Sequence, residues 1–199
     1  MPVKTHHTAV AIVPPEGVWE PIQAIRRRHD RQIHRWMPHC NLLYPFRHQE
    51  EFPAVLPALL GACASLAPFT VSLSEFRHFR QGSGRCTLWL APEPAEALRR
   101  LQAALQAAFP DCDDLSRFPA GFTPHLSIGQ FPSPRDCERT RQQLQAGWQP
   151  VSFVLSEVAL LARERDGAFR MVLRVTLREP GPSLWEDNRS GQPHVSERA

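Results

Sequence analysis

The sequence predicts an α+β fold of two lobes, each an antiparallel sheet with outer helices, related by a pseudo-two-fold axis around a central groove. Strand and helix patterns alternate along most of the 199 residues, and each half contains a short strand followed by a helix. The composition, with 42% hydrophobic and 22% charged residues, is that of a globular protein. We therefore expect one two-lobed domain over residues 1–179. The polar stretch over residues 180–199 is expected to be a disordered tail.

The first half begins with a strand and a helix. Residues 8–13 are continuously apolar and end at two prolines, which is typical of a buried strand. Over residues 17–36, apolar side chains recur at every third or fourth position, and this spacing predicts an amphipathic helix. A short strand follows, and then a second helix near Phe52. Because Pro57 lies inside that helix, we expect it to begin late or to kink.

The second half begins with a hairpin. Residues 69–79 and 86–91 read as strands around a Gln-Gly-Ser-Gly turn. Pro94 fits the first turn of the next helix, and Ser133 is the expected N-cap of a later one. Two closing strands are expected over residues 153–162 and 169–177, joined by an Asp-Gly turn.

Two segments of the chain are nearly the same. Pro-His-Cys-Asn-Leu begins at residue 38, and Pro-His-Leu-Ser-Ile begins at residue 124. Each continues into an aromatic residue next to a proline. Residues i and i+2 of a strand project from the same face, so His39 with Asn41, and His125 with Ser127, would each present an imidazole beside a hydrogen-bond donor.

Two histidines and two donors across a groove suit the cleavage of a phosphodiester. One imidazole can activate water as a base while the other protonates the leaving oxygen, because the ordinary pKa of histidine is about 6.5. Fixed donors from Asn41 and Ser127 would stabilise the charge that builds on the phosphate oxygens. The expected catalytic residues are therefore His39 and His125, and no cofactor or metal is required.

Two other interpretations stay open at this stage. A single histidine in a strand is more often structural than catalytic, and only the matched contexts of His39 and His125 favour catalysis. A metal site is a weaker alternative, because Asn and Ser are poor ligands and no carboxylate stands at a suitable spacing from either histidine.

Other features bear on the substrate and the compartment. Arg27, Arg31 and Arg35 would form a basic stripe on one helix face, which is either a solvated surface or a contact to a polyanion. Of the aromatic residues near the two segments, Tyr44 is the best candidate for contact with a base, since its hydroxyl tolerates a groove edge. The net charge of +3 permits an anionic partner without demanding one. No obligate protein partner is evident.

The cysteines and the apolar segments suggest a reduced, cytoplasmic protein. The chain has five cysteines without a Cys-x-x-Cys pair, which fits neither a disulfide framework nor a zinc ribbon. No run approaches the length of a membrane span, and the N-terminus lacks the apolar core of a signal peptide.

The paired motifs resemble those of a known family. His-x-Asn-Leu-x-Tyr-Pro-Phe from His39 and Thr-Pro-His-x-Ser-Ile-Gly around His125 are similar to the paired signatures of the 2H phosphoesterases, the superfamily of the bacterial 2′-5′ RNA ligases. The Arg-x-x-Leu-Trp-Leu run from Arg85 resembles the central hairpin strand of that family. The resemblance covers about residues 6–178. It implies hydrolysis of 2′,3′-cyclic phosphate RNA ends to 2′-phosphates, often with reversible 2′-5′ ligation.

One position departs from the family pattern. The second residue after the first histidine is usually Thr or Ser, and here it is Asn41, whose amide can still donate to a phosphate oxygen. Ser127 matches the pattern directly. The sequence is compatible with three functions. They are an RNA 2′,3′-cyclic phosphodiesterase, a nucleotide-binding or RNA-binding module with weak turnover, and a phosphodiesterase acting on a small cyclic nucleotide.

Overall fold

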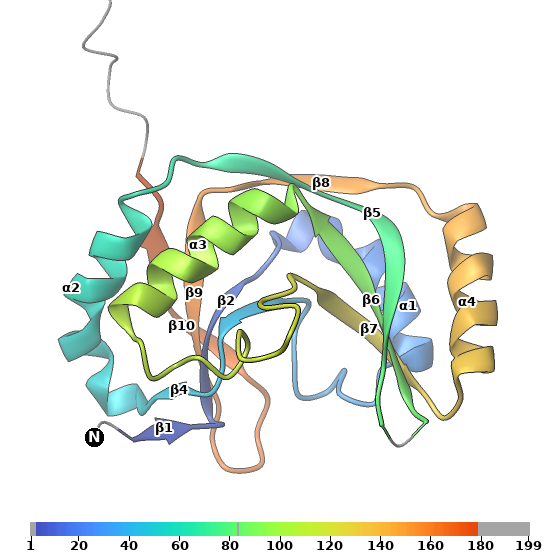
Figure 1. The fold of residues 1–199 in the computed structure, drawn as a ribbon, viewed down its shortest axis with the longest axis horizontal. Coiled ribbons are helices and arrows are strands. Elements are labelled where there is room, and N and C mark those ends of the chain that lie inside the picture. The colour runs from blue at the N-terminus through green and yellow to red at the C-terminus, as the bar shows by residue number, and fades with distance from the viewer. Residues whose placement is uncertain (1–2, 83, 179–199) are drawn as a thin grey trace, which may run out of the picture.

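The computed structural model describes residues 3–82 and 84–178, so the predicted tail over residues 180–199 lies outside the described residues. Figure 1 shows two lobes joined by long strands. The helices are α1 (Trp19–His29), α2 (Phe52–Cys63), α3 (Ala95–Ala108) and α4 (Pro134–Gly147), with 3-10 turns at Glu16–Val18 and Gln49–Glu51. The strands are β1 (Lys4–Thr5), β2 (Thr8–Ile12), β3 (Cys40–Leu43), β4 (Phe46–Arg47), β5 (Phe69–Arg80), β6 (Cys86–Glu93), β7 (Leu126–Phe131), β8 (Val151–Leu155), β9 (Glu157–Ala162) and β10 (Arg170–Thr176).

Two four-stranded antiparallel sheets form the lobes. The first has the strand order β10-β9-β2-β3, and the second has the order β8-β5-β6-β7. In each sheet the edge strand, β3 or β7, directly follows one of the two histidines. This correspondence of strand orders confirms the predicted α+β class with two related lobes. A small additional sheet pairs β1 with β4 and was not predicted.

The helices hold the two lobes together. Helix α1 follows β2 of the first sheet but packs against β7 of the second, and α3 follows β6 of the second sheet but packs against β3 of the first. Helix α2 packs on α3, and α4 covers β5, β6 and β7 at the other end of the molecule (Figure 1). The main apolar core contains side chains from both sheets. The two histidine strands are therefore fixed by elements of both lobes.

The first predicted helix is shorter than expected. It was predicted over residues 17–36, but α1 ends at His29 and the chain becomes extended at Asp30. The Asp30 carboxylate accepts a hydrogen bond from Arg26 Nε at 2.8 Å and another from Gln130 Nε2, on β7, at 3.1 Å. A tertiary contact that the local pattern does not contain therefore accompanies the end of the helix.

The predicted strand over residues 153–162 is in fact two strands. β8 ends at Leu155 and pairs with β5 of the second sheet, whereas β9 begins at Glu157 and pairs with β2 and β10 of the first. The chain passes from one lobe to the other at Ser156, whose carbonyl accepts a hydrogen bond from Leu177 N at 2.8 Å. Both halves have strand-like sequences, so the pattern did not reveal the crossing.

Helices α2 and α4 begin at well-defined residues. Helix α2 begins at Phe52, not later, and it continues through Pro57. Ser133 is the N-cap of α4, as predicted, and its Oγ accepts a hydrogen bond from Asp136 N at 3.2 Å. The cap directly follows β7, so the helix begins at a fixed point beside the second histidine strand.

Candidate active site

The first histidine is held by its own backbone. His39 Nδ1 lies 2.8 Å from the carbonyl oxygen of Met37, and because a carbonyl can only accept, Nδ1 must donate. This bond fixes the tautomer and leaves a lone pair on Nε2 when the ring is neutral. The Nδ2 amide of Asn41 lies 3.3 Å from Nε2 and can donate to that lone pair. The side chains of His39, just before β3, and of Asn41 thus lie next to each other.

The second histidine repeats this arrangement. His125 Nδ1 donates to the carbonyl oxygen of Thr123, also at 2.8 Å and also two residues earlier in the chain. Nε2 of His125 is again the nitrogen that carries the lone pair when the ring is neutral. The two imidazoles are therefore in the same tautomer, each set by a local bond in its own lobe.

Each imidazole lies against a stacked aromatic pair. In the first lobe the Trp36 ring stacks on His39 with the ring centroids 4.2 Å apart, and it also stacks on Phe169. In the second lobe His125 meets Phe79 edge-to-face at 5.0 Å, and Phe79 stacks on Trp89 at 4.8 Å. These four aromatic residues were not predicted as part of the site. They are far from the histidines in sequence, with the exception of Trp36.

The surroundings of the two rings favour their neutral forms. The pKa of His39 is lowered to about 4, mainly by burial and in part by the charges of Arg26 and His125, while the hydrogen bond to the Met37 carbonyl opposes this shift. Burial also lowers the pKa of His125, opposed by its bond to the Thr123 carbonyl. An anionic ligand between the rings would favour imidazolium and raise both values.

The two histidine segments meet at the junction of the lobes. Burial raises the pKa of the thiol of Cys40, the neighbour of His39, to about 12, and the backbone of His125 opposes this rise. The positive charge of a protonated His125 contributes to the lowered pKa of His39. The fold thus brings together two residues that are 86 positions apart in the sequence.

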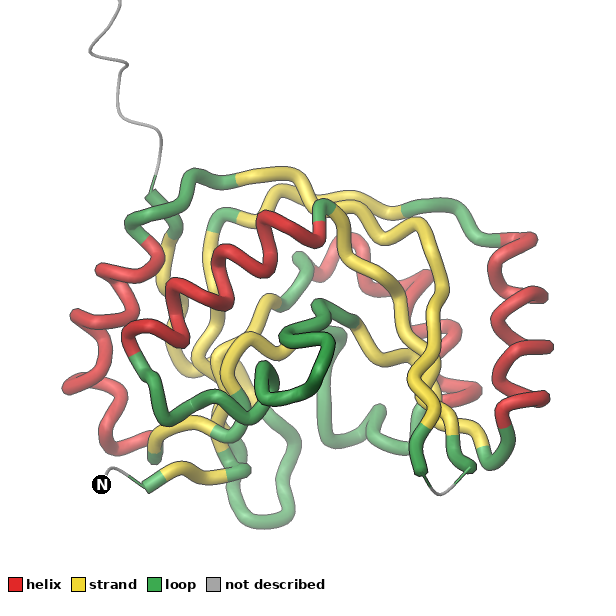
Figure 2. Tube along the Cα trace, viewed as in Figure 1, coloured by secondary structure: helices red, strands yellow, loops and turns green. Residues whose placement is uncertain are grey.

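A cavity of about 890 Å³ adjoins the second histidine. His125 and Ser127 line it together with Phe79 and Thr87, and the loop between α3 and β7 closes one side. This loop runs across the middle of the molecule in Figure 2, and its Phe118 side chain is 62% exposed at the cavity. A volume of this size is typical of small-molecule sites.

The remaining predicted residues lie on the first-lobe side. Tyr44 is half-buried, its ring meets that of Trp36 edge-to-face at 5.6 Å, and its hydroxyl donates to the carbonyl of His6 at 3.4 Å. Burial raises the pKa of Tyr44, against the charges of Arg163 and Arg35. Asn41 Oδ1 is buried without a hydrogen-bond partner among the described residues. Neither Tyr44 nor Asn41 lines the large cavity.

The predicted basic stripe is wrong. Because α1 ends at His29, only Arg27 of the three arginines belongs to the helix, and it pairs with Glu20. Arg31 and Arg35 follow in the loop, and both are exposed. They share no helix face with Arg27.

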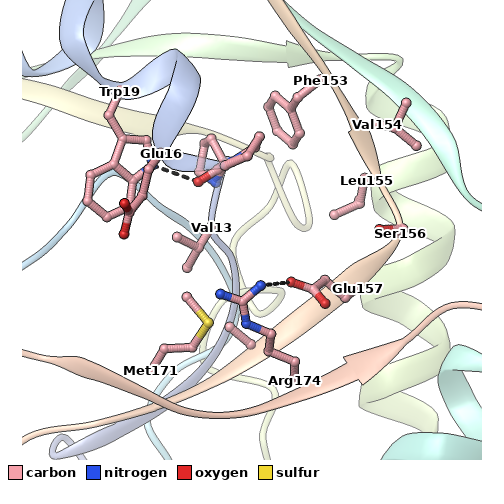
Figure 3. Close-up of a pocket in the computed structure, with 13 residues that line it drawn as sticks. Val13, Glu16, Trp19, Phe153, Val154, Leu155, Ser156, Glu157, Met171 and Arg174 are labelled. Atoms are coloured by element: carbon pink, nitrogen blue, oxygen red, sulfur yellow. Dashed lines mark hydrogen bonds and ion pairs between the residues drawn. The ribbon is translucent and has the colours of Figure 1, made fainter.

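A second cavity is distinct from the histidine pair. Its volume is about 240 Å³, and it lies beside β8, β9 and β10 (Figure 3). Its charged side chains include Glu157 and Arg174, which form an ion pair at 2.6 Å, and Trp19 Nε1 donates to the Pro14 carbonyl. It contains no histidine, so it is separate from the two histidine segments.

Two further observations concern metals and membranes. Over residues 3–82 and 84–178, no three His, Cys, Asp or Glu side chains are grouped so that they could share a metal ion. None of the helices in that part of the chain combines the length and apolarity needed to cross a membrane.

The two related four-stranded sheets, each with an edge strand that follows a histidine, define a two-lobed α+β fold. The sequence profile of the 2′-5′ RNA ligase superfamily matches residues 14–167, and the chain belongs to this family. A Geobacillus kaustophilus protein named as a phosphoesterase, GK0864, is 26% identical over 122 residues, which are 61% of this chain and 67% of that protein. The predicted 2H phosphoesterase membership is thereby confirmed.

Solved structures show the same fold. TT0787 of Thermus thermophilus superposes with a TM-score of 0.59 at 21% identity, over 87% of this chain and 99% of that one. E. coli LigT complexed with phosphate gives 0.55 at 18% identity, over 89% and 100%. LigT complexed with ATP gives 0.57 at 20% identity, over 86% and 98%.

Proposed function

We propose that this protein hydrolyses 2′,3′-cyclic phosphate ends of RNA to 2′-phosphates, with His39 and His125 as its acid–base pair. The observation that carries the proposal is the matched bond from each Nδ1 to a carbonyl two residues earlier. Both bonds leave Nε2 as the nitrogen that exchanges a proton. A cyclic phosphate placed between two such nitrogens has a base on one side and an acid on the other.

The reaction needs two proton transfers. His39, with its pKa lowered to about 4, is neutral at neutral pH and acts as the base. It takes a proton from water as the water oxygen bonds to phosphorus. The bond between phosphorus and O3′ breaks, and protonated His125 gives its proton to O3′, which leaves a 2′-phosphate and a 3′-hydroxyl. A 5′-hydroxyl of a second RNA strand in place of water would give a 2′-5′ linkage.

Ser127 and Asn41 are proposed to bind the phosphate oxygens. Ser127 lines the large cavity with His125 and is half-buried, so its hydroxyl can donate to a ligand there. Asn41 Nδ2 already lies close to His39 Nε2, so the amide would move between the ring and a phosphate oxygen. Tyr44 is proposed to contact the sugar or base on the first-lobe side. Donors to developing negative charge are worth about 10²-fold or more each in rate.

Ligands of the structural relatives are consistent with this site. LigT has been crystallised with phosphate, with 3′-AMP, with NADP+ and with ATP. All four ligands carry phosphate, and three carry an adenine nucleotide. A small cyclic nucleotide is therefore the alternative substrate, and the cytoplasm is the compartment in which we propose that the protein acts.

A second candidate function follows from Asn41. Its Nδ2 faces the lone pair that the base must use, at 3.3 Å from His39 Nε2. If the amide kept that position in the complex, the protein would bind nucleotide ends with little turnover. The family pattern has a hydroxyl there, so Asn41 is the position that separates the two functions.

The product of one reaction distinguishes these proposals. An oligonucleotide with a 2′,3′-cyclic phosphate end is incubated with the protein and excess EDTA, and the products are separated by mass and by phosphatase sensitivity. We expect conversion to the 2′-phosphate. Binding without turnover would favour the module. Activity lost with EDTA and restored by Zn²⁺ or Mn²⁺ would make the two histidines metal ligands instead.

A further inference from the structure

A smaller cavity adjoins the one beside His125. Its volume is about 220 Å³, and it shares Gln81, Thr87 and Gln130 with the large cavity, so the two lie side by side. Two arginines, Arg31 and Arg85, line the smaller cavity and come from separate parts of the chain. An extended ligand whose end lies at His125 can therefore continue into a second, basic compartment.

Arg31 reaches this cavity because α1 ends early. The Asp30 carboxylate is held by Arg26 and by Gln130 Nε2. Gln130 also accepts a hydrogen bond from the backbone N–H of Arg31 through Oε1, at 2.9 Å. The Gln130 side chain of β7 thus binds both the Asp30 carboxylate and the backbone of Arg31. The end of the helix, which removed Arg31 from the predicted stripe, places it beside the second histidine strand.

Arg85 comes from the end of the β5–β6 hairpin. It immediately precedes β6, and its carbonyl accepts a hydrogen bond from Gln81 N at 2.8 Å across the end of the hairpin. Gln81 Nε2 donates to Thr87 Oγ1 at 3.2 Å. The hairpin end beside the cavity is therefore tied to residues that also line the large cavity.

The charge of this compartment is uncompensated. None of the described residues that line either cavity is acidic. In the part of the chain that the structure describes, neither Arg31 nor Arg85 is within ion-pair distance of a carboxylate. The nearest acid in sequence, Asp30, is already bound by Arg26. Two exposed guanidinium groups that face one cavity are well suited to a phosphodiester, which accepts hydrogen bonds from both.

We propose that Arg31 and Arg85 bind the internal phosphodiester on the 5′ side of the terminal nucleoside. This inference rests on the proposed function and makes it narrower, because the preferred substrate is then an oligonucleotide and not a mononucleotide cyclic phosphate. The large cavity receives the terminal nucleoside and its cyclic phosphate. The smaller cavity receives the next phosphate along the strand.

Three substrates test the proposal. They are cytidine 2′,3′-cyclic phosphate, a dinucleotide with the same end, and that dinucleotide with an uncharged methylphosphonate linkage. In the wild-type protein, the methylphosphonate should raise KM at least about tenfold relative to the charged dinucleotide, the size of one charge-assisted hydrogen bond. Its effect on kcat should be less than about twofold. The KM of the charged dinucleotide should also rise with salt more steeply than that of the mononucleotide.

The arginine variants identify the residues responsible. In Arg31→Gln and in Arg85→Gln, the KM ratio between the uncharged and charged dinucleotides should fall to about threefold or less, and in the double variant to about one. Arg31→Lys should restore part of the ratio. The control is Arg100→Gln, an exposed arginine of α3 that lines neither cavity and should keep the tenfold ratio. Thermal unfolding of each variant confirms that it folds.

Two failures are distinguishable. If the wild-type protein hydrolyses all three substrates with the same KM, or if the double arginine variant keeps the tenfold ratio, the phosphodiester site is overturned and the catalytic proposal stands. If the wild-type protein hydrolyses none of the three, the proposed function is itself wrong.

Discussion

The two histidine strands have the same local construction but different surroundings. In both, Nδ1 of the imidazole donates to a carbonyl two residues earlier, and the ring rests on a stacked aromatic pair. His125, however, opens on a cavity of about 890 Å³, whereas His39 does not line that cavity and has an amide at its Nε2. The large cavity therefore belongs to the second lobe, and under the proposed function the second lobe would hold most of the substrate while the first lobe would provide the base.

A further difference lies four residues after each histidine. β7 has Gly129 there, and β3 has the fully buried Leu43. A Cβ on residue 129 would lie 2.7 Å from His29 Cβ and 3.2 Å from the His29 carbonyl oxygen, at the end of α1. The close approach of α1 to β7 therefore requires a glycine at this position. The same approach brings Asp30 at the end of α1 into contact with Gln130.

Removal of either imidazole should have the largest effect. His39→Ala and His125→Ala should each lower kcat by about 10²–10⁴-fold, the contribution of a general acid or base. The measurement is steady-state turnover of an oligonucleotide with a 2′,3′-cyclic phosphate end. His34→Ala, an exposed histidine, is the matched control. A variant that keeps more than half of wild-type kcat would show that its histidine is structural.

The two polar partners should differ from one another. Ser127→Ala should lower kcat by about 10²-fold, because it removes a donor from the side of the large cavity. Asn41→Thr restores the hydroxyl of the family pattern and should keep kcat within about tenfold of wild type. A rise in kcat above that range would mean that the Asn41 amide inhibits the base, and an inactive variant would mean that the amide does what a hydroxyl cannot.

Gly129→Ala should act on stability first. We expect a loss of about 1–3 kcal/mol in the free energy of unfolding, since His29 and the end of α1 must move. Urea denaturation measures this loss. Gly147→Ala, where an added Cβ has open space within 4 Å, is the control and should cost less than about 0.5 kcal/mol. Equal stability of the two variants would show that the approach of α1 to β7 is not tight.

The sequence predicted the paired segments and the order of most elements, because both depend on local patterns. The equal spacing of His39 with Asn41 and of His125 with Ser127 was enough to place each pair at the beginning of a strand. The end of α1 was not predictable, since Asp30 is bound by Gln130, a residue 100 positions away. The division of residues 153–162 between two sheets was missed for a similar reason. The alternation of apolar and polar residues predicts a strand but does not specify the strand with which it pairs.

Local sequence patterns also fail to predict most of the residues that surround the two histidines. Trp36 could have been recognised as a neighbour of His39 by its position three residues earlier. Phe79 reaches His125, and Phe169 reaches Trp36 beside His39, only through tertiary packing. The second basic compartment also depends on tertiary structure, because it joins the loop after α1 to the end of the β5–β6 hairpin.

The pH dependence of kcat/KM in the two histidine variants tests the acid–base pair most directly. Because the pKa of His39 is lowered to about 4 and that of His125 lies below 6.5 in the free protein, the wild-type profile should be a bell with its maximum between these values. The profile of kcat should be displaced to higher pH, since bound phosphate favours imidazolium. His39→Ala should lose the acidic limb, and His125→Ala the alkaline limb, with EDTA present throughout. Retention of both limbs in either variant, or loss of the same limb in both, would contradict the account.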